Sequence, residues 1–280
     1  EMVANWCLKR SHNINDLRKY ARLQVPRPMF HYMDGAADDE VTLAHNCRDY
    51  ERYELLPRYL VDVGEIDTRT TVMGQAIDFP VVCAPTGMSR LFNNDGELAV
   101  SAAAAEAGTV YSLSTVSTYS IEEVAEVCAG PKWFQIYVFR DRELINEFID
   151  RCRKAAYQAL ILTVDVPVPG NRERDLYTGM MIPPQLTLAS WFNFFLHPLW
   201  SLKYLLSEDF QLANVVHKAP VSDRDVSTLV GYLQRQFDPS VDWDAAAWMI
   251  EQWDGPFAIK GICCVEDAIR CAEIGATAVI

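Results

Sequence analysis

The stretch Ala159-Leu-Ile-Leu-Thr-Val-Asp165 is a short apolar run that follows a helical segment, Arg151–Gln158. The same unit, a helical segment that ends in small residues and is followed by an apolar run, recurs at 102–114 and at 265–280. Continuous apolar strands that alternate with amphipathic helices are typical of a parallel sheet covered by helices. The sequence therefore predicts an α/β fold.

Six strands of this kind follow one another along the chain. They are predicted at 80–86, 109–115, 133–138, 159–165, 256–262 and 276–280. A doubly wound sheet is the alternative fold, but it normally carries a glycine-rich phosphate turn after its first strand, and the sequence has no G-x-G-x-x-G. We therefore predict a TIM (β/α)8 barrel, with about six of its eight strands in residues 1–280. In such a barrel, the active site lies at the C-terminal ends of the strands.

The predicted barrel forms a single domain over 1–280, with a helical N-terminal segment, 1–79, and a long loop insertion, 170–255. Within the N-terminal segment we expect helices at 14–23, 27–33 and 39–50, and then an extended stretch at 55–70. The last predicted strand stops at Ile280, whereas a closed barrel needs two more strands. The expectation is that a C-terminal part of the barrel is missing from these residues.

Composition limits the classes of partner. The chain has 280 residues, half of them apolar, and a formal net charge of −13. So acidic a protein is not expected to bind nucleic acid through bulk electrostatics, and an anionic substrate needs a local basic site. The eight cysteines show no metal-site spacing and lie mostly among apolar residues, so we predict reduced thiols, a cytoplasmic location and no metal site.

Two polar residues share one face of an otherwise apolar strand. Gln135 and Tyr137 alternate with Phe134 and Ile136, and buried polar side chains need hydrogen-bond partners. A flavin ring edge and a substrate carboxylate would supply them. An ordinary hydrogen-bonded pair in the core is the alternative.

Two charged residues close the strands that follow. Asp165 ends its strand on the same face as Thr163, and such a carboxylate is costly unless it is paired or functional. It could orient a catalytic histidine, or it could form a structural salt bridge with Arg172 or Arg174. Lys260 ends the next apolar strand and could stabilise negative charge on a reduced cofactor, or it could pair with a nearby carboxylate. None of the five histidines lies at the end of a predicted strand.

Six short segments, in order, resemble the FMN-dependent 2-hydroxy-acid dehydrogenase and oxidase family, from about Asn15 to Ile280. They are Phe30–Glu40, Ala84–Met88, Ser112–Thr115, Phe134–Tyr137, Leu162–Asp165 and Ile259–Gly261. Within the family, the Phe30–Gly35 run, Gly87 and the Phe237-Asp-Pro-Ser240 stretch are most similar to the bacterial respiratory L-lactate dehydrogenase type.

The resemblance implies a role for each site residue. Tyr32 and Tyr137 would contact the substrate carboxylate and hydroxyl, Arg172 would bind the carboxylate, and Asp165 would orient the catalytic histidine. FMN would be the cofactor, and its ring would be lined by Ala84, Pro85, Thr86, Ser114, Gln135, Thr163 and Lys260. The family's Ser-Asn-His-Gly-Gly-Arg-Gln segment, which carries the base and a second substrate arginine, follows the strand that stops here at Ile280.

The implied reaction is oxidation of an L-2-hydroxy acid, most plausibly L-lactate, to the 2-keto acid, with electrons passed to quinone or another acceptor. An O₂-using oxidase of the glycolate or mandelate type, and a non-catalytic barrel subunit, are the alternatives. Related barrels are often tetramers, so a homo-oligomer is expected by analogy.

One segment of the insertion is unusually apolar. Leu186–Leu206 reads LTLASWFNFFLHPLWSLKYLL, with Pro198 placed where it would break a spanning helix. We predict peripheral contact with the inner face of the cell membrane. A loop that packs on its own barrel or on a neighbouring subunit is the alternative.

Overall fold

The computed structural model describes residues 2–166, 168, 170–180, 185–207, 210–218, 231 and 236–280. Contacts divide the chain into two compact units. Unit 1 comprises Glu1–Val61 with Gly170–Asp209, and unit 2 comprises Asp62–Pro169 with Phe210–Ile280. Each unit is described by itself, and the predicted single domain over 1–280 stays a prediction.

Unit 2 is built on a six-stranded sheet in which every neighbouring pair is parallel. The strands follow sequence order across the sheet and are β3 (Cys83–Thr86), β4 (Tyr111–Ser114), β5 (Lys132–Tyr137), β6 (Ala159–Thr163), β7 (Phe257–Lys260) and β8 (Ala278–Val279). This strand order confirms the α/β prediction and the six successive barrel strands. Strand β5 has the predicted length but begins one residue earlier, and the other five strands are shorter than predicted.

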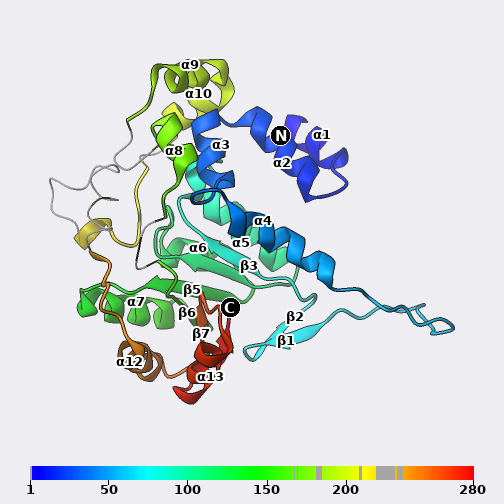
Figure 1. Ribbon diagram of the computed structural model, residues 1–280, viewed down its shortest axis with the longest axis vertical. Coiled ribbons are helices and arrows are strands. Elements are labelled where there is room, and N and C mark those ends of the chain that lie inside the picture. The colour runs from blue at the N-terminus through cyan, green and yellow to red at the C-terminus, as the bar shows by residue number, and fades with distance from the viewer. Residues whose placement is uncertain are drawn as a thin grey trace. The chain divides into compact units, whose positions relative to one another are not determined.

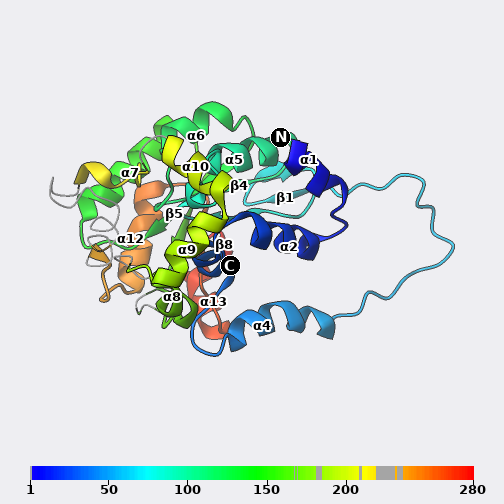
Figure 2. The same cartoon turned by 90° about the horizontal axis from the view of Figure 1, so that it is seen from above.

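Helices connect the successive strands on one side of this sheet (Figure 1). They are α5 (Gly96–Glu106), α6 (Ile121–Val127), α7 (Arg142–Lys154), α12 (Trp243–Trp253) and α13 (Val265–Glu273), with the 3₁₀ turns η2 (Ser89–Leu91) and η3 (Val216–Lys218). Side-chain caps fix where several of these helices begin: Ser120 and Glu123 form a capping box on α6, and Asp141 caps α7. Helix α5 contacts α6, α6 contacts α7 and α7 contacts α12, and Figure 2 shows these four following one another around the strands.

The two faces of the sheet bury different side chains, because successive residues of a strand point to opposite sides. Phe134, Ile136 and Leu160 pack against the helices in the larger core cluster. Trp133 and Ile161 lie on the opposite, inner face in a smaller cluster. The inner face is thus apolar near the start of the strands.

An antiparallel hairpin adds to this smaller cluster, and the sequence-based prediction missed it. Strand β1 (Thr70–Val72) pairs with β2 (Gln75–Ile77) through a turn at Met73 and Gly74, whose φ angles are 49° and 78°. A two-residue turn with both φ angles positive is a common hairpin connection. Ile77 is 2% exposed and packs with Val110 and Trp133.

Unit 1 is helical. It contains α1 (Met2–Lys9), α2 (Ile14–Gln24), α3 (Arg27–Asp34), α4 (Val41–Arg48), the 3₁₀ turn η1 (Asp49–Arg52), α8 (Glu173–Thr178), α9 (Leu188–Leu196) and α10 (Pro198–Leu206). The predicted N-terminal helices are present, although the third is divided between α4 and η1. Helix α3 contacts α2, α8 and α9 within this unit.

The predicted insertion over 170–255 includes α8, α9, α10 and α12, and its residues 181–184, 208–209, 219–230 and 232–235 lie outside the described part of the chain. No helix in the described part is long and apolar enough to cross a membrane.

Candidate active site

The predicted polar residues of unit 2 meet at the C-terminal end of the inner face. Backbone register places Ser114 beside Gln135 across β4 and β5. It places Tyr137 beside Thr163 and Thr163 beside Lys260 across β5, β6 and β7. The strands therefore bring together side chains that are separated by up to 146 residues of sequence, counted from Ser114 to Lys260.

Gln135 is the buried centre of this group. Ser114 Oγ donates a 3.0 Å hydrogen bond to Gln135 Oε1, and both residues are 2% exposed or less. Gln135 Nε2 is also buried and has no hydrogen-bond partner among the described residues. A buried donor without an acceptor is costly, and native proteins usually satisfy it with protein, water or ligand. The amide is therefore available to an acceptor above the apolar floor formed by Trp133, Ile161 and Ala258.

Lys260, the last residue of β7, and Asp165, which follows β6, form an ion pair. Lys260 Nζ lies 3.7 Å from Asp165 Oδ2, and both side chains are partly exposed. Within unit 1, Arg172 pairs with Asp175, and Arg174 pairs with Asp34 and Glu40. A salt bridge of Asp165 with Arg172 or Arg174 stays a prediction. A nearby carboxylate was the structural alternative predicted for Lys260, and the structure shows that this carboxylate belongs to Asp165.

The residues of β3 are less enclosed than those of the neighbouring strands. Ala84 and Thr86 are exposed and Pro85 is half-buried. Strand β3 pairs with β4 through Cys83 and Thr86, with a shift of register between them. These residues lie at the edge of the six-stranded sheet, next to the strand that carries Ser114.

Unit 1 brings together the other two predicted substrate residues. The Arg172 guanidinium carbon lies 5.0 Å from the centre of the Tyr32 ring, and Arg172 also donates to the Tyr32 carbonyl oxygen. Asp175 holds Arg172 Nε at 2.6 Å. Burial raises the pKa of the Tyr32 hydroxyl, so the hydroxyl stays protonated and can donate a hydrogen bond near neutral pH. A cation and a hydroxyl on adjacent elements suit a carboxylate ligand.

Two residues that matter here were not predicted. Asp175 orients Arg172 through an ion pair. The sequence could have indicated this pair, because side chains three residues apart on a helix are neighbours. Gly261 has a φ of +104°, and a Cβ there would lie 2.7 Å from the Cβ of Asp165. The glycine directly after Lys260 was the sign in the sequence that another backbone segment approaches this position closely.

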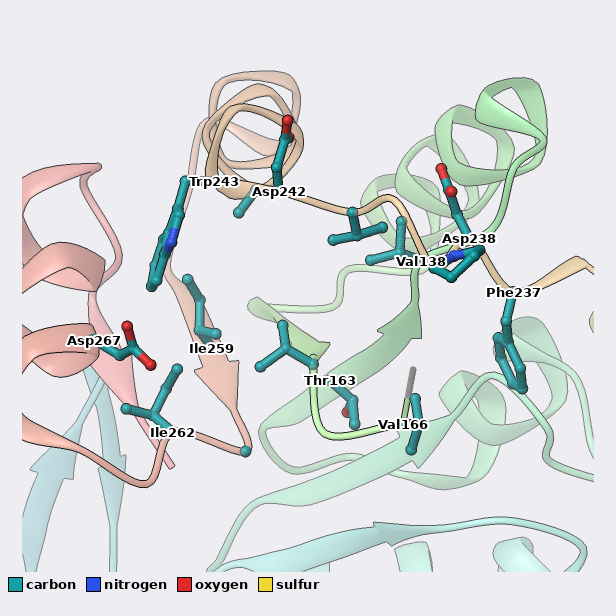
Figure 3. Close-up of a pocket in the computed structure, with 15 residues that line it drawn as sticks. Val138, Thr163, Val166, Phe237, Asp238, Asp242, Trp243, Ile259, Ile262 and Asp267 are labelled. Carbon is teal, nitrogen blue, oxygen red and sulfur yellow. The ribbon is translucent and has the colours of Figure 1, made fainter. Parts of the chain in front are cut away.

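Each unit also contains a pocket. In unit 2, a pocket of about 320 Å³ lies beside the ends of β5, β6 and β7 and is bounded by Phe237, Asp242, Trp243, Thr163, Gly261 and Ile262 (Figure 3). In unit 1, a pocket of about 650 Å³ is lined by Arg18, Arg22, His31, Asp34 and Arg174. Arg18 and Arg174 already contact Asp34, which reduces the positive charge available to a ligand.

Comparison with known proteins gives a consistent result. The family model for FMN-dependent dehydrogenase matches residues 21–280. The chain is 39% identical to an L-lactate dehydrogenase of Xanthobacter autotrophicus and 36% identical to one of Haemophilus influenzae, in each case over 95% of this chain and over 68% and 70% of theirs. Across the first three matching relatives, the chain spans 63% to 70% of their length.

Solved structures agree with the sequence relatives. The monotopic membrane protein (S)-mandelate dehydrogenase matches with a TM-score of 0.91 at 33% identity, over 96% of this chain and 71% of that chain. Mandelate oxidase matches with a TM-score of 0.77 at 30% identity, over 96% of this chain and 68% of that chain.

Proposed function

The chain belongs to the FMN-dependent dehydrogenase family, and from this premise we propose that the whole protein oxidises an L-2-hydroxy acid, foremost L-lactate, to the 2-keto acid. The observation that carries the proposal is the buried Gln135 amide, whose Nε2 donor has no partner among the described residues. The amide lies between the Ser114 hydroxyl and the strand ends that carry Thr163 and Lys260. Family membership and an available donor at the predicted position together support a cofactor site.

The residues present fit a flat ring system with hydrogen-bond acceptors along one edge. The inner face supplies an apolar floor, a donor at Gln135 Nε2 and a cation at Lys260. When bound, FMN accepts the two electrons that leave with the α-hydrogen of the hydroxy acid. Lys260 supplies positive charge where negative charge develops at the ring edge, and Asp165 holds the ammonium group in place. Ala84, Pro85, Thr86, Ser114 and Thr163 are proposed to complete the lining.

Three residues are proposed to bind the substrate, as the family resemblance implies. The Arg172 guanidinium and the protonated Tyr32 hydroxyl, which lie together, would bind the carboxylate. The Tyr137 hydroxyl would contact the substrate hydroxyl. Asp165 serves a second purpose in this proposal, because its carboxylate would orient and stabilise the histidine base that the family carries.

The test uses the full-length protein, purified with its flavin and assayed against L-lactate, D-lactate, glycolate and (S)-mandelate with a quinone analogue as acceptor. The highest kcat/KM for L-lactate supports the proposal. The mandelate matches favour a second candidate, oxidation of an aromatic hydroxy acid, and a higher kcat/KM for (S)-mandelate would select it. Peroxide formed at the rate of turnover would assign O₂ as the acceptor. A colourless full-length protein would instead indicate a non-catalytic barrel.

The apolar helices of unit 1 support peripheral membrane contact as part of this function. Helices α9 and α10 expose large apolar side chains: Leu188, Trp191, Phe192, Phe195, Leu196, Leu199, Leu202, Leu205 and Leu206. Several of them are more than three-quarters exposed, for example Phe195 at 78%. Exposed apolar surface of this extent marks an interaction site, and a structural relative is described as monotopic. We propose that the protein binds the inner face of the cell membrane as a homo-oligomer and delivers electrons to quinone.

A further inference from the structure

The Phe237-Asp-Pro-Ser240 stretch returns from the long insertion and docks beside the end of β5. Arg140 N donates to Gln236 O at 2.9 Å, and Asp238 N donates to Val138 O at 3.1 Å. These bonds flank an antiparallel bridge between Phe139 and Phe237. The backbone of Phe237 is therefore fixed opposite Phe139, the second residue after Tyr137.

This docking brings the Phe237 ring against Tyr137. The ring centres lie 5.2 Å apart with an interplanar angle of 68°, which is an edge-to-face contact. The other side of Phe237 stacks on Phe139, with ring centres 5.6 Å apart and planes within 7°. Phe139 is fully buried and contacts Phe148 of helix α7. A continuous row of rings thus connects the rigid helix-facing core to Tyr137.

Tyr137 is the last residue of β5. Its side chain is half-buried, and the next residue of the same face, Phe139, turns into the helix-facing core. Edge-to-face packing restricts the rotation of an aromatic ring and adds to the energy of simple burial. In Figure 3, Phe237 lies near Asp238, on the side of the pocket opposite Trp243. No contact between Phe237 and the predicted flavin lining is needed for this effect.

We propose that Phe237 is a positioning residue, which holds the Tyr137 ring so that its hydroxyl stays where the substrate binds. This inference rests on the proposed role of Tyr137 in substrate contact. The Phe237-Asp-Pro-Ser240 stretch would thereby affect the reaction, because it fixes the position of the Tyr137 hydroxyl. Asp238 Oδ1 accepts from Ser240 N at 3.0 Å and stabilises the turn that follows Phe237.

The experiment compares Phe237→Leu, Phe237→Met and Phe237→Tyr in the full-length, FMN-loaded protein, with Phe257→Leu at the start of β7 as the matched core control. Each variant is assayed for kcat and KM with L-lactate and for oxalate affinity, read from the flavin spectrum. We expect Leu and Met to lower kcat/KM by roughly 10- to 100-fold and to weaken oxalate binding, because small misplacements of a site group are costly. Phe237→Tyr, which keeps the ring, should stay within about threefold of the wild type. Phe257→Leu, which changes an equally buried ring outside this row, should lower only the melting temperature.

A double-mutant cycle with Tyr137→Phe decides whether Phe237 acts through the hydroxyl. In the Tyr137→Phe background, Phe237→Leu should change kcat/KM by less than about threefold, because the group that it positions is already absent. An equal loss in both backgrounds, or wild-type kinetics in Phe237→Leu and Phe237→Met, would overturn the inference. A wild-type protein that lacks flavin or lactate oxidation would instead refute the proposed function.

Discussion

Gly261 and Asp165 approach each other so closely at the ends of β7 and β6 that a side chain on Gly261 would overlap the aspartate. A Cβ at Gly261 would lie 2.7 Å from Asp165 Cβ and 3.0 Å from Asp165 N. This approach places the Asp165 carboxylate next to Lys260, the residue before the glycine. The ion pair of the site thus depends on a backbone position that only glycine can occupy without displacement.

Replacing Gly261 with alanine should therefore damage both stability and the site. We expect Gly261→Ala to lower the free energy of unfolding by about 2–4 kcal/mol, because it combines positive-φ strain with a clash. Gly275→Ala is the matched control, since its φ is +93° and the nearest atom to its added Cβ is 3.8 Å away. Its free energy of unfolding should fall by about 1–2 kcal/mol, because it introduces the positive-φ strain without the clash. Equal losses in urea titrations of the two variants would contradict the close approach.

Lys260→Met should slow reduction of the flavin by L-lactate by roughly 10²- to 10³-fold, because it removes the cation proposed to stabilise developing negative charge. Stopped-flow absorbance under anaerobic conditions measures this rate. Lys154→Met, on the exposed last turn of α7, is the control and should behave as the wild type. An unchanged reduction rate and unchanged FMN affinity in Lys260→Met would remove Lys260 from the site.

Removing the Gln135 amide should have opposite effects on two quantities, the stability of the apoprotein and the affinity for FMN. The paired replacement Ser114→Ala with Gln135→Leu removes the unpartnered buried amide together with its neighbour, so the apoprotein should be as stable as the wild type or more stable. FMN should bind about 10- to 100-fold more weakly, because a hydrogen bond from a buried donor is lost. Calorimetry of the apoprotein and flavin titration measure the two effects. Tighter or unchanged FMN binding would show that the amide does not face the cofactor.

Unit 1 should contribute an acid-sensitive part of the stability. The Arg18 guanidinium beside Asp34 holds the pKa of that carboxyl below its usual value of 3.8. Because the folded pKa is lowered, the stabilisation is fully present above pH 3.8 and is lost as the pH falls through the folded pKa. Asp34→Asn should therefore be less stable than the wild type at neutral pH, and the difference should shrink in strong acid. A difference that is constant with pH in urea titrations would refute the assignment.

The exposed side of α9 should govern membrane binding. Trp191 and Phe195 are 62% and 78% exposed, and burial of an aromatic side chain contributes about 1.5–3 kcal/mol. Replacing both with serine should weaken co-sedimentation with phospholipid vesicles by roughly 100-fold or more. Val265→Ser changes a residue of α13 that is 69% exposed and should leave binding unchanged. Undiminished vesicle binding of the double variant would exclude this surface.

Strand positions and the polar strand ends could be predicted because each depends on local pattern. Continuous apolar runs indicated β4 to β7. Simple alternation predicted that Gln135 shares a face with Tyr137, and Thr163 with Asp165. The partner of Lys260 could not be predicted, because Asp165 follows β6, which is separated from β7 in sequence by the long insertion. The β1–β2 hairpin was missed because its strands are only three residues long and mostly polar or exposed. The sequence showed that Phe237 belongs to a stretch similar to the family. It could not show the contact with Tyr137, because that contact depends on where the end of the long insertion packs.

The most direct test of the account is anaerobic mixing of the full-length, flavin-containing protein with L-lactate or D-lactate. We expect L-lactate to bleach the oxidised flavin absorbance and to yield one equivalent of pyruvate per flavin, whereas D-lactate should leave the spectrum unchanged. A protein that purifies without FMN and does not take it up would contradict the account. So would bound flavin that stays oxidised in the presence of L-lactate and of every other L-2-hydroxy acid tested.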